Sequence, residues 1–155
     1  MNPVFRRVLE VFDDLAREVL DLSTLAERAG STTPAERDAV RAVLTELVQQ
    51  GWLRSAGRWD QFVRTEDGRL ALAGPLDVTL YTRQGCHLCE EAKAEMVPLL
   101  REFGARLHEV DIDSDPVLRE RFTNDVPVIF LGQRKVAKHR IDLRRFRRQL
   151  EQASS

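Results

Sequence analysis

The two cysteines of the chain, Cys86 and Cys89, lie in one Cys-His-Leu-Cys segment. An apolar segment at 78–82 predicts a buried strand before them, and the spacing at 90–103 predicts a helix after them. A cysteine at such a turn lies at the helix N-terminus, where unpaired backbone N–H groups and the helix dipole stabilise a thiolate. We therefore predict that Cys86 attacks a disulfide, and that Cys89, one turn further along the same face, resolves the mixed disulfide.

Two other interpretations of these cysteines stay open at this point. A structural zinc site needs four ligands, and without a second C-x-x-C only His87, His108 and His139 could complete the set. Two inert buried thiols are the simpler alternative, because free cysteine is among the most buried residue types. The placement of both cysteines in one turn favours redox chemistry, so we predict no bound metal.

The composition is typical of a soluble globular protein. Hydrophobic residues make up 43% of the 155 residues and charged residues 32%, which allows a core without a bias toward disorder. The longest apolar run, 126–131, is too short to span a bilayer, and the N-terminus lacks a signal-peptide pattern. We expect a cytoplasmic protein, and in that reducing compartment a C-x-x-C is more often catalytic or redox-sensing than a permanent cross-link. The net charge of −1 gives no general attraction to nucleic acid.

The first half of the chain predicts three helices, a β-hairpin and a short final helix. Thr24 with Glu27, and Thr33 with Glu36, have the spacing of capping boxes, and Gly30 can end a helix in the left-handed conformation. The predicted elements are helices at 3–20, 23–29 and 34–50, strands at 52–55 and 61–64, and a last helix at 65–72.

This order of elements resembles a winged helix-turn-helix. The segments 25–30, 47–53 and 65–68 are similar to those of bacterial winged-helix regulators, and the resemblance covers a domain of residues 1–73. In that family the third helix enters the major groove and the wing contacts phosphate. Such regulators are commonly dimers, so the resemblance also implies a homodimer.

The charges of this half argue against tight DNA binding, because it contains more acids than bases. The predicted third helix has a mixed exposed face, formed by Arg37, Arg41, Glu36, Asp38 and Glu46. Three arginines around the wing favour DNA, namely Arg54, Arg58 and Arg64. We interpret this domain as a module for protein contacts, and DNA binding is the alternative.

The second half predicts the order strand, helix, strand, helix, strand, strand, helix. After the C-x-x-C helix the predicted elements are a strand at 106–110, a helix at 115–122, strands at 128–131 and 135–137, and a last helix capped by Asp142. Leu143, Phe146 and Leu150 form the expected buried face of that helix. Its arginines at 144, 145, 147 and 148 are interpreted as a solvated face.

This order, with C-x-x-C after the first strand and Val126-Pro127 before the third, resembles the glutaredoxin branch of the thioredoxin fold. The segments 80–92 and 110–116 are similar to small glutaredoxin-like bacterial proteins, and the resemblance covers 76–152. It implies an α/β domain with a four-stranded mixed sheet and helices on both faces. It also implies that Cys86 is the nucleophile, Cys89 the resolving thiol and Pro127 a cis proline, beside which the Val126 backbone pairs with a peptide or thiol substrate.

Further positions bear on the substrate. Arg83 matches a basic residue of the family, and is predicted to lower the pKa of Cys86 or to hold a carboxylate. His87 either stabilises the thiolate or projects into solvent. The family has a glycine pair that approaches glutathione, whereas this chain has Ala137-Lys138 followed by His139-Arg140. The resemblance thus implies thiol exchange more firmly than glutathione use, and leaves glutathione as a candidate reductant, with no bound cofactor expected.

Two functions follow as hypotheses. The first is a thiol-disulfide oxidoreductase acting on a protein or small-molecule disulfide, fused to a domain for contacts. The second is a redox-responsive winged-helix regulator in which the two cysteines act as a sensor. Turnover separates them, because an enzyme must be reduced repeatedly and a sensor only once per signal.

Overall fold

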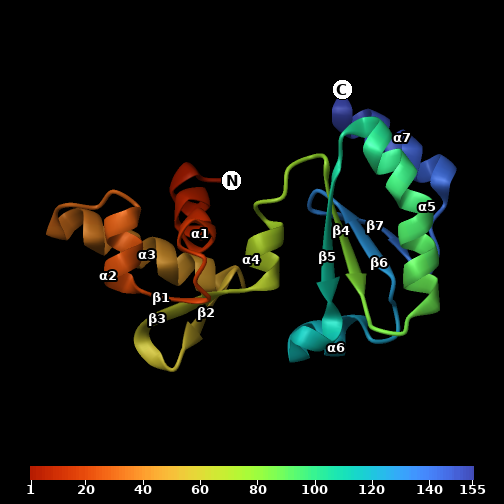
Figure 1. The fold of residues 1–155 in the computed structure, drawn as a ribbon. Coiled ribbons are helices and arrows are strands. Elements are labelled where there is room, and N and C mark those ends of the chain that lie inside the picture. The colour runs from red at the N-terminus through yellow and green to blue at the C-terminus, as the bar shows by residue number, and fades with distance from the viewer. The chain divides into compact units, whose positions relative to one another are not determined.

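The computed structural model describes all residues from Met1 to Ser155, and the chain divides into two compact units, Met1–Leu72 and Ala73–Ser155 (Figure 1). Each unit has its own hydrophobic core. None of the helices is both long and apolar enough to cross a membrane.

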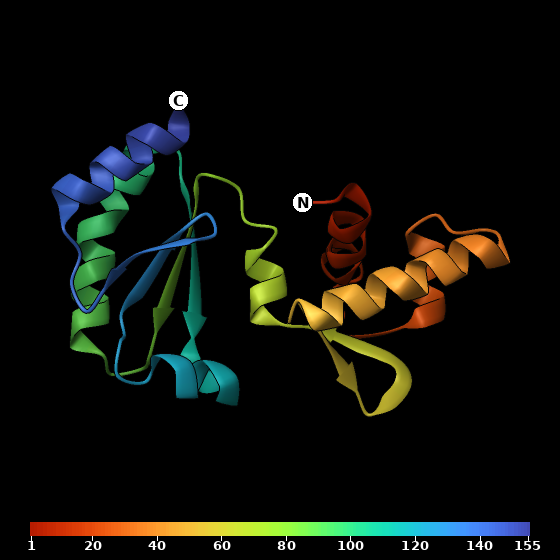
Figure 2. The same ribbon diagram turned by 180° about the vertical axis from the view of Figure 1, so that it is seen from behind.

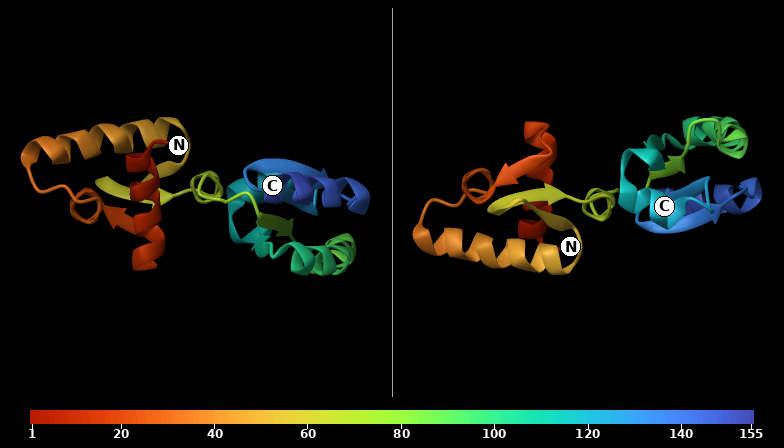
Figure 3. Two further views of the ribbon diagram at one scale, coloured as in Figure 1. Left: turned by 90° about the horizontal axis from the view of Figure 1, so that it is seen from above. Right: turned by 90° about the horizontal axis from the view of Figure 1, so that it is seen from below.

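The first unit combines helices with a small antiparallel sheet of order β1-β3-β2. Its core is aliphatic, and α1 lies across α3 in this unit (Figure 3). The elements are α1 (Pro3–Leu15), β1 (Val19–Asp21), α2 (Leu22–Arg28), α3 (Pro34–Gln49), β2 (Leu53–Ala56), β3 (Arg58–Arg64) and α4 (Glu66–Leu70).

The predicted first helix was too long. Helix α1 ends at Leu15, because Ala16 adopts the left-handed conformation with φ 49° and its N–H donates to the Asp13 carbonyl at 3.1 Å. Residues 19–21 form β1 instead, paired with β3 through Val19 and Val63. Sequence spacing missed this strand because it depends on a partner far along the chain.

One predicted capping box is confirmed and the other is wrong. Thr33 and Glu36 form the reciprocal bonds at the start of α3. At α2 the cap is Asp21, whose carboxylate accepts the Thr24 N–H at 2.7 Å. A carboxylate is a strong cap because it carries a full charge near the positive end of the helix dipole.

The second unit is an α/β domain with a four-stranded mixed sheet of order β5-β4-β6-β7 (Figure 2). Strand β4 is parallel to β5 and antiparallel to β6, and β6 is antiparallel to β7. The elements are β4 (Asp77–Thr82), α5 (His87–Phe103), β5 (Arg106–Asp111), η1 (Ile112–Ser114), α6 (Pro116–Phe122), β6 (Val128–Leu131), β7 (Arg134–Lys138) and α7 (Leu143–Ser154). This architecture is compatible with a thioredoxin-like fold.

Strand β4 is buried on both faces, which explains its continuous apolar sequence. On one face, Val78 and Leu80 pack in a core with side chains of α5 and α7. On the other, the Tyr81 ring lies 4.8 Å from that of Phe122 in α6 and 5.5 Å from that of Phe130. Helices therefore cover both faces, as the resemblance implied.

Two helix predictions in this unit need correction. Helix α5 begins at His87 rather than at 90, so three residues of the C-x-x-C segment belong to it. Leu143 is 38% exposed and lies outside the core, since it is the first residue of α7; Phe146 and Leu150 alone supply the buried face predicted there.

Asp77, at the start of β4, is a buried acid held by several donors. Its carboxylate accepts the Gly74 N–H at 2.6 Å, and lies 2.8 Å from Arg106 Nε and 3.3 Å from His108 Nε2. Burial opposes its charge, but the Gly74 N–H, His108 and Arg106 together hold the pKa of Asp77 below its usual value. The carboxylate therefore stabilises the folded state above about pH 4, and this contribution is lost as the pH falls through the lowered pKa.

We expect Asp77→Asn to lower the free energy of unfolding at pH 7 by about 1 to 3 kcal/mol, because charged hydrogen bonds are lost. The difference from the wild type should shrink below about pH 4, where the wild-type carboxyl is increasingly protonated. Urea unfolding followed by circular dichroism at several pH values measures both. A difference that stays constant down to acidic pH would show that the charge of Asp77 is not what stabilises the fold.

Candidate active site

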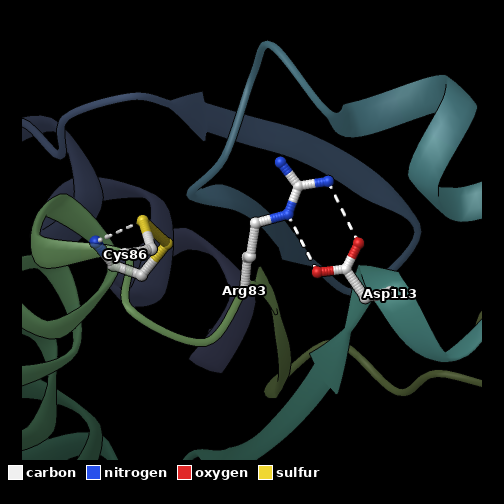
Figure 4. Close-up of a disulfide and its surroundings, with 4 residues drawn as sticks. Arg83, Cys86 and Asp113 are labelled. Carbon is white, nitrogen blue, oxygen red and sulfur yellow. Dashed lines mark hydrogen bonds and ion pairs between the residues drawn. A yellow bond between two sulfur atoms is a disulfide. The ribbon is translucent and has the colours of Figure 1, made fainter.

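Cys86 is the N-cap residue of α5, with an extended backbone at φ −81° and ψ 104°. Its sulfur accepts the backbone N–H of Cys89 at 3.2 Å, so a donor of the first helical turn points at the sulfur predicted to attack. Gly85, in the left-handed conformation at φ 74°, makes the turn that brings Cys86 to this position. Figure 4 shows this turn.

Cys86 and Cys89 form a disulfide, with their Cα atoms 5.3 Å apart (Figure 4). The two sulfurs differ in access, because Cys86 is partly exposed whereas Cys89 is 1% exposed. An external thiol or disulfide can therefore reach Cys86 more easily than Cys89. This asymmetry supports the predicted division into an attacking and a resolving thiol.

The Val126–Pro127 peptide bond is cis, and Pro127 is buried. The pairing of Tyr81 with Val128 places Pro127 next to Thr82, where the chain leaves β4 toward the cysteines. The Val126 N–H donates to the Phe122 carbonyl at 3.2 Å and so closes the end of α6. The N–H of Val126 is therefore engaged within the fold, so the predicted pairing of the Val126 backbone with a substrate would use its carbonyl oxygen.

Arg83 points away from the disulfide (Figure 4). Its Nε lies 3.0 Å from one Asp113 oxygen and its second nitrogen 3.1 Å from the other, and it also donates to Thr123 Oγ1 at 3.1 Å. Arg83 thus holds a carboxylate, but one of the protein itself. In this arrangement it anchors the segment before the cysteines to η1 and to the end of α6.

His87 projects into solvent, with 88% of its side chain exposed. Its Nε2 lies 3.3 Å from Glu91 Oε1, one turn further along α5. Of the two arrangements left open for His87, the structure shows the exposed one.

Residues 77–151 match the model of a family described as Glutaredoxin-like domain (DUF836). The "Glutaredoxin-like protein YDR286C homolog" of Dictyostelium discoideum is 37% identical to this chain over 73 residues, which make up 43% of the chain and 68% of that protein. The chain belongs to the glutaredoxin-like family. The Cys86–Cys89 disulfide fits a redox couple in such a domain. The family match covers the second unit only, and the first unit lies outside it.

In the glutaredoxin-like unit, the segment after β7 lies beside the start of α5. His139 has a left-handed backbone at φ 64°, and its N–H donates to the Pro127 carbonyl at 2.8 Å. A cavity of about 160 Å³ lies between the start of α5 and the segment after β7, lined by Leu88, Glu91, Ala92, Glu95, His139, Arg140 and Ile141. The sequence indicated His139 as a conceivable zinc ligand and, with Arg140, as a departure from the family near the glutathione position, but no local pattern indicated its contact with Pro127.

The ion pair between Arg83 and Asp113 is expected to stabilise the fold without affecting the reactivity of Cys86. We expect Arg83→Met and Asp113→Asn each to lower the free energy of unfolding by about 0.5 to 1 kcal/mol, with a coupling of similar size in the double variant, because both groups are partly exposed. The rate at which reduced Cys86 reacts with iodoacetamide should stay close to that of the wild type. A marked loss of that reactivity in Arg83→Met alone would mean that Arg83 acts on the thiolate.

Proposed function

We propose that the glutaredoxin-like unit is a thiol-disulfide oxidoreductase that works through Cys86 and Cys89. The observation that carries the proposal is the disulfide at the N-terminus of α5, with one accessible sulfur and one buried sulfur. The N–H of Cys89 and the helix dipole stabilise the Cys86 thiolate once the disulfide is reduced.

The reaction has two exchange steps. The Cys86 thiolate attacks one sulfur of a substrate disulfide, a mixed disulfide forms, and the other substrate sulfur leaves as a thiolate. The Cys89 thiolate then attacks the Cys86 sulfur, which forms the Cys86–Cys89 disulfide and releases the second substrate thiolate. The substrate is reduced by two electrons, and the protein is oxidised by two.

A thiol reductant must restore the cysteines, and we propose glutathione or a thioredoxin system in a cytoplasmic setting. Ala137 and Lys138 pair with Ile129 and Val128 at the positions where the family approaches glutathione with glycines. The side chains of Ala137 and Lys138 occupy part of that space, so we do not expect glutathione to form a stable noncovalent complex. Glutathione would then act as a reductant through thiol exchange alone.

Turnover tests this proposal. The purified protein, hydroxyethyl disulfide and glutathione are combined with glutathione reductase and NADPH, and NADPH oxidation is followed; a parallel assay uses thioredoxin and its reductase. We expect turnover above the uncatalysed rate in at least one assay. If the reduced protein consumes one equivalent of disulfide and then stops in both assays, the enzymatic proposal is wrong, and a sensor is favoured.

We further propose that the first unit is a winged-helix domain that mediates contacts with proteins. The order α1-β1-α2-α3-β2-β3, with a hairpin after the third helix, supports this. A groove of about 360 Å³ between α3 and the hairpin is lined by apolar side chains including Leu44, Val48 and Phe62, and Trp59 at its edge is 77% exposed. Exposed apolar surface of this kind marks interaction sites.

A DNA-binding regulator is the second candidate, favoured by exposed arginines on α3 and on the hairpin, namely Arg37, Arg41, Arg54 and Arg58. Arg64 does not add to them, because it pairs with Asp13 at 2.6 Å and donates to the Leu9 carbonyl at 3.0 Å. We expect duplex DNA to bind weakly and equally in the oxidised and reduced states, as measured by fluorescence anisotropy at physiological salt. Tight binding that changes with the redox state would favour the regulator.

A further inference from the structure

The surface between β7 and α7 is strongly basic. From Arg134 to Arg148 the chain has eight Lys or Arg residues and a single acid, Asp142. Six of these cations line two adjoining cavities of about 230 and 440 Å³, which share Arg145 and Gln149. We call this surface the basic groove, and its cations are Arg134, Lys135, Lys138, Arg140, Arg145 and Arg148.

The charges of the basic groove are largely unpaired. Lys138 lies 3.9 Å from an Asp125 oxygen, and the other five cations have no ion pair. Arg147 lines neither cavity, and it pairs with Glu102 through two contacts of 2.8 Å. The carboxylate of Asp142 is engaged as the N-cap of α7. In a chain with a net charge of −1, this is a local excess of positive charge that attracts anionic groups.

The lining of the basic groove fits a protein segment better than a nucleic acid. Val136, Ala137 and Ile141 are half-buried and supply apolar surface between the cations, which can receive apolar side chains. The exposed large hydrophobic residues of this unit are Val117 and Leu143, so it presents no aromatic ring on which a base could stack. Strand β7 is also an edge strand, beside which an extended segment can lie (Figure 2).

The basic groove adjoins a cavity at the start of the cysteine helix α5. Arg140 and Ile141 line both the groove and the cavity at the start of α5, whose lining includes Leu88, between the two cysteines, and the acids Glu91 and Glu95. The neighbouring His139 is bonded through its N–H to the Pro127 carbonyl. A segment bound in the groove can therefore extend toward the start of α5, where Cys86 is the N-cap residue.

We propose that the basic groove binds an acidic segment of a protein substrate, and that it brings a disulfide next to that segment to Cys86. This inference rests on the proposed oxidoreductase function and names its substrate class. Attraction between the groove and the segment raises the rate of encounter, and the exchange chemistry at the cysteines is unchanged.

The test compares charge-reversed variants of the full chain. Arg145→Glu with Arg148→Glu alters the groove, and Arg17→Glu with Arg28→Glu, at two exposed positions of the first unit, changes the net charge equally. Three disulfide substrates are compared. Two are peptides, one acidic and one basic, each with its single cysteine linked to cysteamine by a disulfide bond, and the third is hydroxyethyl disulfide. We expect the groove variant to lose about tenfold or more in kcat/KM for the acidic peptide alone, at low salt. The first-unit variant should retain the wild-type value.

Equal losses of kcat/KM in the two variants, or equal kcat/KM values for the acidic and basic peptides, would overturn the inference about the groove. The proposed oxidoreductase function would still stand in that case if hydroxyethyl disulfide were turned over. If no disulfide were reduced, the proposed function would fail, and anisotropy of a labelled acidic peptide with serine in place of cysteine would still report docking. Tighter binding of duplex DNA than of that peptide, lost in the groove variant, would assign the groove to nucleic acid and overturn the inference.

Discussion

Replacement of Cys86 by serine is expected to abolish disulfide exchange, whereas replacement of Cys89 should leave the first step intact and stop the second. Cys86 is the accessible sulfur, and it receives the N–H of Cys89 at the start of α5. Without it, the buried Cys89 has little access to an external disulfide. In Cys89→Ser the mixed disulfide on Cys86 has no internal thiol to resolve it, so it should accumulate.

Intact mass spectrometry after incubation with a peptide disulfide measures this difference. Cys89→Ser should gain the mass of one peptide thiol in stoichiometric amount, and Cys86→Ser should gain almost none. The variant lacking both cysteines controls for noncovalent carry-over. Equal trapping by the two single variants would contradict the assigned roles.

The second large effect concerns the fold of the first unit. Gly68 lies in α4, and a Cβ added there would lie 2.2 Å from the Trp52 carbonyl oxygen and 3.0 Å from a carbon of the Arg64 side chain. Because one of these atoms is backbone, the contact cannot be relieved by a change of rotamer. We expect Gly68→Ala to lower the free energy of unfolding of this unit by about 2 to 3 kcal/mol.

Tryptophan fluorescence during urea unfolding reports on this unit, since Trp52 and Trp59 both belong to it. Gly51→Ala is the matched control, because Gly51 has φ 79° and open space around it, so that only the left-handed backbone is penalised, by about 1 to 2 kcal/mol. If Gly68→Ala proved as stable as the wild type, the close approach of α4 to Trp52 would be wrong.

The features that the sequence predicted well are those set by near neighbours. The capping box at Thr33 and the Asp115-Pro116 start of α6 depend on residues within one helical turn, and both are present. The strand, the turn and the cysteines at the start of α5 form another local pattern. The family relationship of 77–151 followed from motifs of the same kind.

The features that the sequence missed depend on partners far along the chain. Strand β1 is defined by pairing with β3, and the apolar spacing of α1 continues past the residue that ends it. The sequence predicts Arg64 as a cation for DNA and Arg83 as a group that acts on Cys86 or a substrate, but Arg64 pairs with Asp13, 51 residues away, and Arg83 with Asp113, 30 residues away. The basic groove likewise forms only where β7 and α7 lie together. The predicted solvated face of α7 is confirmed for Arg144, Arg145 and Arg148, which are exposed.

In the proposed function, Cys86 and Cys89 form a reversible two-electron couple. An equilibrium redox titration of the purified protein in glutathione buffers, read by the mass added when free thiols are alkylated, tests it directly. We expect a single two-electron transition between about −270 and −120 mV, the range of known oxidoreductases. Thiols that never pair, or that pair only after a metal is removed, would contradict the claim.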